Sequence, residues 1–152
     1  MPLASGDPAP TFRLTDIATG EVVTEPWAGG PVALVFFKVT CPVCQMVAPK
    51  VQALADGGAR VVAVGQDPPD RLEAYRSRFG QDVPTLTESP PYLVSDAYRI
   101  TAVPTLFRIG KDGTIEDTVG AWDRTGWNDV ATALGAPPIS AAGDGLPPYR
   151  PG

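Results

Sequence analysis

Two short apolar runs dominate the middle of the chain. Residues 32–39 begin with six apolar side chains in a row, and residues 60–65 contain four more. An uninterrupted apolar strand suits the centre of a parallel sheet, where helices cover both faces. The pattern therefore predicts two buried, parallel strands at the centre of the molecule.

Other apolar residues recur three or four positions apart, which is the spacing of a single helix face. They are Val47, Val51, Leu54 and Ala55, then Leu72, Tyr75 and Phe79, and finally Trp127, Val130 and Leu134. Three helices are expected from these positions, the first ending at Gly57-Gly58 and the second covering 69–79. Residues 95–100 have room for one or two further helical turns.

Two hairpins are expected around this centre. The first joins residues 11–16 to 21–23, and the second joins 105–109 to 115–119. In the second, Gly113 stands where the turn needs a positive φ. Strands alternating with helices, followed by a closing hairpin and helix, make an α/β sandwich with a central mixed β-sheet.

The chain divides into one domain, residues 1–135, and a C-terminal tail, residues 136–152. The tail is rich in Pro, Gly and Ala, and a composition of this kind predicts a loosely ordered segment. The whole chain of 152 residues is large enough for one normal core.

Composition removes several classes of function. The net charge is −5 and no Lys/Arg cluster is present, which argues against nucleic acid or an anionic membrane surface. The chain has no histidine, and its two cysteines are too few for a structural zinc site, although a zinc half-site shared between two chains stays open. We expect no metal and no cofactor. The first residues lack the pattern of a signal peptide, so the expected location is cytoplasmic, unless a leader was trimmed.

The two cysteines stand in one motif, Cys41-Pro42-Val43-Cys44, between the first apolar strand and the first helix. At this spacing a disulfide can close on the first helical turn with little backbone movement. The unpaired N–H groups of a helix N-terminus stabilise a thiolate, and the thiolate is the attacking species in thiol–disulfide exchange. The motif predicts a redox enzyme.

The chain resembles the thioredoxin superfamily over about residues 6–134. Cys41 to Pro49 resembles the active-site helix, Val103 to Phe107 resembles the cis-proline loop with its strand, and Gly120 matches the glycine after the hairpin. The opening residues 6–12 and an α/β insert near 68–93 resemble the TlpA-like and AhpC/TSA-related branches.

The resemblance implies a thioredoxin-like fold and a protein-disulfide oxidoreductase that acts as a monomer. Cys41 is then the exposed nucleophile and Cys44 the buried resolving cysteine. Residues beside them are expected to bind the substrate: Thr40, Pro42, Val43, Val103 and Pro104. The implied partners are a disulfide-containing protein substrate and a thiol/disulfide electron donor.

Val-Pro-Thr-Leu occurs twice, at 83–86 and at 103–106. We assign the cis-proline to Pro104, because an unbroken strand and hairpin follow it. Pro84 is followed within six residues by Pro90-Pro91, which a central strand cannot contain, so Pro84 is expected to start a strand.

Three positions depart from the family pattern. Thr40 replaces a tryptophan, and Val35 and Val47 stand where the family keeps carboxylates. No carboxylate is left in the motif's vicinity to take the proton of Cys44, whose pKa is therefore expected to be raised. Lys38 is the nearest ionisable side chain in the sequence, either a solvated strand-end residue or a cation that lowers a cysteine pKa.

Two other functions stay open. A peroxidase needs a Pro-x-x-x-Thr/Ser-x-x-Cys cradle, but the corresponding positions hold Leu34 and Lys38 before Cys41, and Phe37 and Cys41 before Cys44. The other alternative is a redox-sensing or redox-inert adaptor, since a fold does not fix a function. Trp27, Trp122 and Trp127 are expected to serve packing rather than substrate contact.

Overall fold

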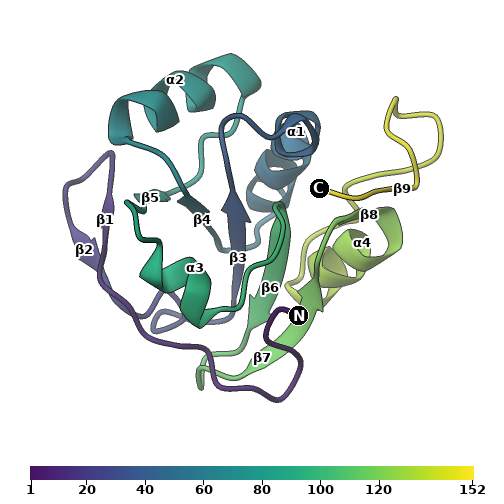
Figure 1. Cartoon of the computed structure of the whole chain (residues 1–152). Helices are drawn as coiled ribbons and strands as arrows, with labels where there is room; N and C mark the ends of the chain where they lie inside the picture. Colours follow the sequence, from purple (N-terminus) through teal and green to yellow (C-terminus); the bar gives the residue numbers. More distant parts are fainter.

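The computed structural model describes all 152 residues and is built around one seven-stranded sheet (Figure 1). Its strands are β1 (Leu14–Asp16), β2 (Val22–Val23), β3 (Val32–Phe37), β4 (Val61–Gly65), β5 (Thr85–Thr87), β6 (Thr105–Ile109) and β7 (Ile115–Val119). The helices are α1 (Pro42–Asp56), α2 (Pro69–Phe79), α3 (Leu93–Ala97) and α4 (Arg124–Ala133). A separate pair consists of β8 (Trp122–Asp123) and β9 (Tyr149–Arg150).

The strand order is β2-β1-β5-β4-β3-β6-β7. Strands β3, β4 and β5 are parallel, and the pairings of β1 with β2, β1 with β5, β3 with β6 and β6 with β7 are antiparallel. The mixed sheet and both hairpins are therefore as predicted. Pro84 directly precedes β5, as expected of a strand-start proline, and its carbonyl accepts from Ala63 N–H.

Strand β3 lies at the centre because every one of its side chains is apolar and buried. Alternate residues face opposite sides of the sheet. One set, with Val35 and Phe37, packs with residues of α1, α2 and α4, and the other, with Leu34 and Phe36, packs with Tyr98 and the N-terminal segment. The three tryptophans are 0–5% exposed, in agreement with their expected packing role.

The C-terminal tail corrects the prediction of a loosely ordered segment. Ile139 is buried in the core, β9 pairs with β8, and Lys50 forms an ion pair with Asp144 at 3.0 Å. Trp122 Nε1 donates to the Pro147 carbonyl at 2.8 Å. The tail has no apolar periodicity, yet it is ordered because side chains of the domain bind its backbone.

Two boundaries also differ from the prediction. The central strand ends at Phe37 rather than at residue 39, since the chain turns there and Cys41 N–H donates to the Lys38 carbonyl at 3.1 Å. Helix α3 begins at Leu93, two residues before the expected turns. None of the helices combines the length and the apolar character that crossing a bilayer requires.

Candidate active site

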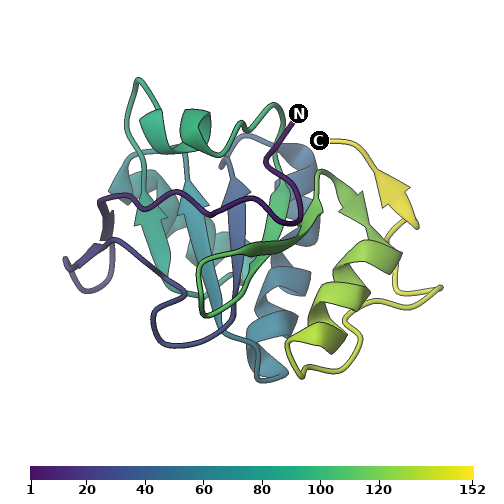
Figure 2. The same ribbon diagram turned by 90° about the horizontal axis from the view of Figure 1, so that it is seen from below.

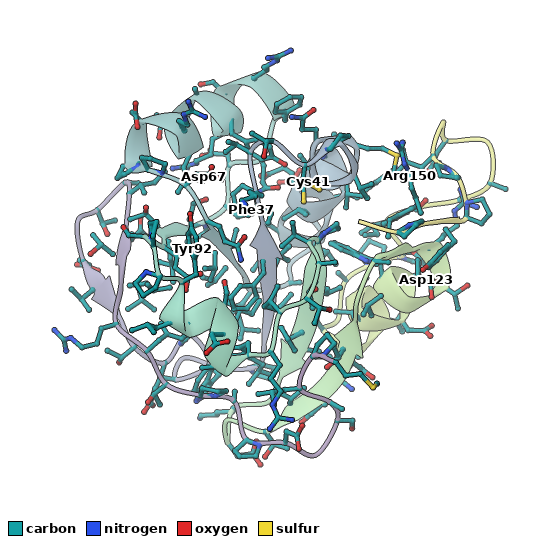
Figure 3. All side chains as sticks on the ribbon, viewed as in Figure 1. Phe37, Cys41, Asp67, Tyr92, Asp123 and Arg150 are labelled. Carbon is teal, nitrogen blue, oxygen red and sulfur yellow. The ribbon has the colours of Figure 1, made fainter.

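The cysteine motif lies at the start of α1, shortly after the end of β3. Cys41 is the N-cap residue of α1, with extended backbone angles, and Pro42 occupies the first turn, where its missing N–H costs nothing. The chain thus places the Cys41 sulfur at the helix N-terminus, as the sequence predicted (Figure 3). Both cysteines are free thiols in this structure.

Cys41 is half-buried and its environment favours the thiolate. Its sulfur accepts a hydrogen bond from Cys44 N–H at 3.1 Å, and its thiol lies 3.5 Å from the Val103 carbonyl, to which it can donate. The hydrogen bond from the Cys44 side chain, together with backbone N–H groups and the charge of Arg150, lowers the pKa of Cys41 to about 6, against the opposing effect of burial.

Cys44 is only 3% exposed, and its environment favours the thiol. Burial and the hydrogen bond to Cys41 raise the pKa of Cys44 well above its ordinary value. Val35 and Val47 are each 1% exposed and belong to the same apolar cluster as Cys44, so no carboxylate from these two positions opposes that shift. The expected order of the two thiols, Cys41 exposed and acidic and Cys44 buried, agrees with this geometry.

The five expected substrate-binding residues divide into three groups. Thr40 and Pro42 are exposed beside Cys41, and the half-buried Val103 and buried Pro104 lie on its other side, joined by a cis peptide bond. Val43 differs, because its side chain is buried in the core and offers no surface to a substrate. A second cis bond, between Pro90 and Pro91, was not predicted from the sequence.

Two polar side chains that the sequence analysis did not select hold the loop before the motif. Asp67 accepts from Val39 N–H at 2.9 Å, and Gln45 donates to the Val39 carbonyl at 2.7 Å. Asp67 follows β4, the parallel neighbour of β3, so both strands end at the same edge of the sheet. That topology was a signal from which Asp67 could have been predicted.

The C-terminal tail also reaches the site, although no sequence pattern predicts this contact. Figures 1 and 2 both place the C-terminal end beside the N-terminal end of α1. The Arg150 guanidinium lies 3.8 Å from the Met46 sulfur of α1 and adds positive charge near Cys41. Gly152 packs so closely on the Val103 carbonyl that a side chain at position 152 would overlap it.

The model of the AhpC/TSA family matches residues 5–118, well over half of the chain. The chain belongs to the AhpC/TSA family. The match includes the cysteine motif, the Val103-Pro104 segment and most of the sheet.

Several proteins similar to this AhpC/TSA-family chain are named disulfide oxidoreductases. It is 28% identical, over 122 residues, to the thiol-disulfide oxidoreductase ResA of Geobacillus kaustophilus, covering 77% of this chain and 70% of that protein. Its fold matches the thioredoxin domain of a Bacteroides vulgatus thiol-disulfide oxidoreductase with a TM-score of 0.73 and 19% identity, over 87% of this chain and 99% of that one.

A third similar protein is a secreted Mycobacterium tuberculosis disulfide oxidoreductase, homologous to Escherichia coli DsbE. The TM-score is 0.69 with 20% identity, over 82% of this chain and 96% of that one. At such identities these two structures show the fold alone, which is thioredoxin-like. Family and fold together make this AhpC/TSA-family chain an oxidoreductase of the thioredoxin type.

Proposed function

We propose that this protein is a thiol–disulfide oxidoreductase that reduces disulfides of protein substrates with the Cys41–Cys44 pair. The observation that carries the proposal is the asymmetry of the two thiols: Cys41 is half-exposed with a pKa near 6, whereas Cys44 is buried behind it with a raised pKa. A single thiolate accessible at neutral pH is what the first step of exchange requires.

The reaction has two steps. The Cys41 thiolate attacks one sulfur of the substrate disulfide, a mixed disulfide forms, and the first substrate thiolate leaves. Cys44 then loses its proton and attacks the Cys41 sulfur, which releases the second substrate thiolate and closes the Cys41–Cys44 disulfide. The substrate gains two electrons and the enzyme loses them. Cys44 supplies one proton of the two substrate thiols, and solvent supplies the other.

Thr40, Pro42, Val103 and Pro104 are the proposed contacts of the substrate chain. The first two are the exposed chain neighbours of Cys41, and the Val103 carbonyl lies 3.5 Å from the Cys41 sulfur. A thiol/disulfide donor then returns the pair to the dithiol, with no metal or cofactor, and the protein works as a monomer. The direction of electron transfer follows from the reduction potential of the Cys41–Cys44 pair, which decides whether the pair reduces or oxidises its partners.

The test is reduction of insulin with dithiothreitol as donor. We expect the parent protein to accelerate it, Cys41→Ser to abolish the acceleration, and Cys44→Ser to trap a mixed disulfide that mass spectrometry detects. A parent without turnover whose Cys41 nevertheless changes redox state would instead support the sensing adaptor.

Peroxide reduction is the second candidate, and the family match favours it. Against it, Lys38 and Leu34 occupy the positions where the peroxide cradle needs a hydroxyl and a proline. We expect no consumption of hydroperoxide in the presence of the same donor. Consumption that depends on Cys41 would reverse the order of the two candidates.

The cytoplasmic location stays a prediction from the sequence. One of the similar structures belongs to a secreted protein, which favours a location outside the cytoplasm instead. Cell fractionation of the full-length gene product, with alkylation of free thiols at harvest, reports both the compartment and the redox state of Cys41 there.

A further inference from the structure

A cavity of about 210 Å³ lies between the start of α1 and one face of α2. Its lining is Val39, Gln45, Arg71, Ala74, Tyr75, Arg78 and Phe79. Val39 and Gln45 stand on either side of the cysteine motif, so the cavity borders the active site. The residues from α2 share one face because they recur three and four positions apart.

The charge of this lining is one-sided. It contains two arginines and no carboxylate, although the whole chain has a net charge of −5. Neither Arg71 nor Arg78 takes part in an ion pair, whereas Arg76 on the same helix binds Glu73 and Asp82. Arg78 lies over the Phe79 ring, 5.1 Å from its centre, which helps to orient its guanidinium. Both arginines are exposed and free of ion pairs, and a guanidinium binds a carboxylate through paired N–H groups.

Tyr75 lines the same cavity. This residue is 3% exposed, and its hydroxyl has no hydrogen-bond partner. The hydroxyl oxygen is itself enclosed, so other atoms of Tyr75 form its part of the cavity wall. The charge of the Cys41 thiolate helps to raise the pKa of Tyr75 after the larger effect of burial, so the same residue connects the cavity to the reactive sulfur.

We propose that the Arg71–Arg78 cavity holds a carboxylate of the disulfide substrate while Cys41 attacks the adjacent sulfur. The chemistry selected is a disulfide flanked by carboxylates, which either a peptide rich in Asp and Glu or a small acidic thiol such as glutathione can supply. This inference rests on the proposed function and adds a substrate class to it.

The test compares disulfides of different charge. The fully reduced protein is mixed with glutathione disulfide, neutral hydroxyethyl disulfide or cationic cystamine, and formation of the Cys41–Cys44 disulfide is followed in time. A matched pair of peptide disulfides, one flanked by glutamates and one by glutamines, completes the set. We expect anionic substrates to react fastest at low salt and to lose that advantage as salt screens the arginines.

Arg71→Gln and Arg78→Gln should each slow the anionic substrates by roughly two- to five-fold, and leave the neutral one unchanged. Arg13→Gln is the matched control, because it removes the same charge from an exposed arginine that lines a different cavity, beside Glu88.

The relative rates distinguish the two possible sources of the carboxylate. Selective slowing with glutathione disulfide alone assigns the cavity to a small thiol, and with the acidic peptide alone to a protein segment. Equal rates for all charges, or equal slowing by Arg13→Gln, overturn the inference. The neutral disulfide keeps the two proposals apart, since its reduction requires Cys41 and Cys44 whether or not the cavity binds an anion.

Discussion

At the scale of single residues, the site depends on giving two identical side chains opposite acidities. Cys41 caps the helix and receives hydrogen bonds, while Cys44 is buried three residues later and donates one. The pKa of Cys41 is lowered to about 6 and that of Cys44 is raised. Around neutral pH the reduced pair therefore carries one negative charge, located on the accessible sulfur.

Removing the Cys44 side chain tests the main cause of that acidity. In Cys44→Ala we expect the pKa of Cys41 to rise from about 6 toward 9, because the hydrogen bond from Cys44 is the largest contribution. Thiolate ultraviolet absorbance and the rate of alkylation of Cys41, both as functions of pH, measure it. Cys44→Ser is the matched control: it keeps a donor and should shift the pKa less. A midpoint that stays near 6 in Cys44→Ala would assign the acidity to the helix N-terminus instead.

The reduction potential should report the same asymmetry. Below the pKa of Cys41, reduction of the disulfide takes up two protons with two electrons, so the potential should fall by about 59 mV per pH unit. Above pH 6 only Cys44 binds a proton, and the slope should decrease to about 30 mV per pH unit. Equilibration with a dithiol buffer at several pH values locates the break. A single steep slope up to pH 8 would contradict the pKa assigned to Cys41.

At the scale of elements, the strands and helices near the site were predictable because they obey periodicity. The apolar run of β3 and the helical spacing in α1 and α2 gave their positions within a few residues. Asp67 was not predicted because it acts through one backbone contact, to Val39, and only its place after β4, the parallel neighbour of β3, points to that role. The unpaired hydroxyl of Tyr75 was hidden for a related reason, since its position on α2 indicated only packing.

The centre of β3 offers a test of the missing acid. In Val35→Asp we expect a carboxylate beside the cluster that contains Cys44 to accept its proton, so the mixed disulfide should resolve faster near neutral pH. The parent should resolve slowly at pH 6 and faster toward pH 9, because burial disfavours the Cys44 thiolate. The turnover rate of a disulfide substrate across that range measures both.

Val35 is 1% exposed, so a polar side chain there should cost about 2–5 kcal/mol of stability. Val35→Asn is the matched control, because it is polar and similar in size but cannot take a proton. Equal rates in the Asp and Asn variants would mean that the carboxylate does not reach Cys44. A parent rate already high and independent of pH would mean that another group carries the proton.

At the scale of the whole molecule, the C-terminal tail joins α4 to the active site. Arg124 of α4 donates to Ser140 and to the Leu146 carbonyl, and Trp122 donates to the Pro147 carbonyl. These bonds lead β9 toward Cys41. Composition predicted a loose tail because the tail has no apolar pattern. The bonds that hold it use backbone carbonyls as acceptors, and a proline-rich sequence has these as any other sequence does.

Shortening the tail should therefore change how large substrates reach Cys41. Gly152 covers the Val103 carbonyl, on the side of Cys41 where the substrate chain is proposed to pair. A chain ending at Pro148 should reduce insulin severalfold faster, while its reaction with hydroxyethyl disulfide should change little, because a small molecule does not need that backbone edge. Loss of the Arg150 charge should raise the pKa of Cys41 slightly.

Two point variants separate the steric effect of the tail from its charge. Gly152→Ala should lift the end of the tail, because its side chain would overlap the Val103 carbonyl, and should speed insulin reduction without changing the pKa of Cys41. Arg150→Gln should raise that pKa without speeding insulin reduction, since the tail stays in place through β9 and its bonds to Trp122 and Arg124. If the shortened chain and Gly152→Ala reduce insulin no faster than the parent, the tail does not limit access. In that case its contact with Val103 serves only to complete the packing around the active site.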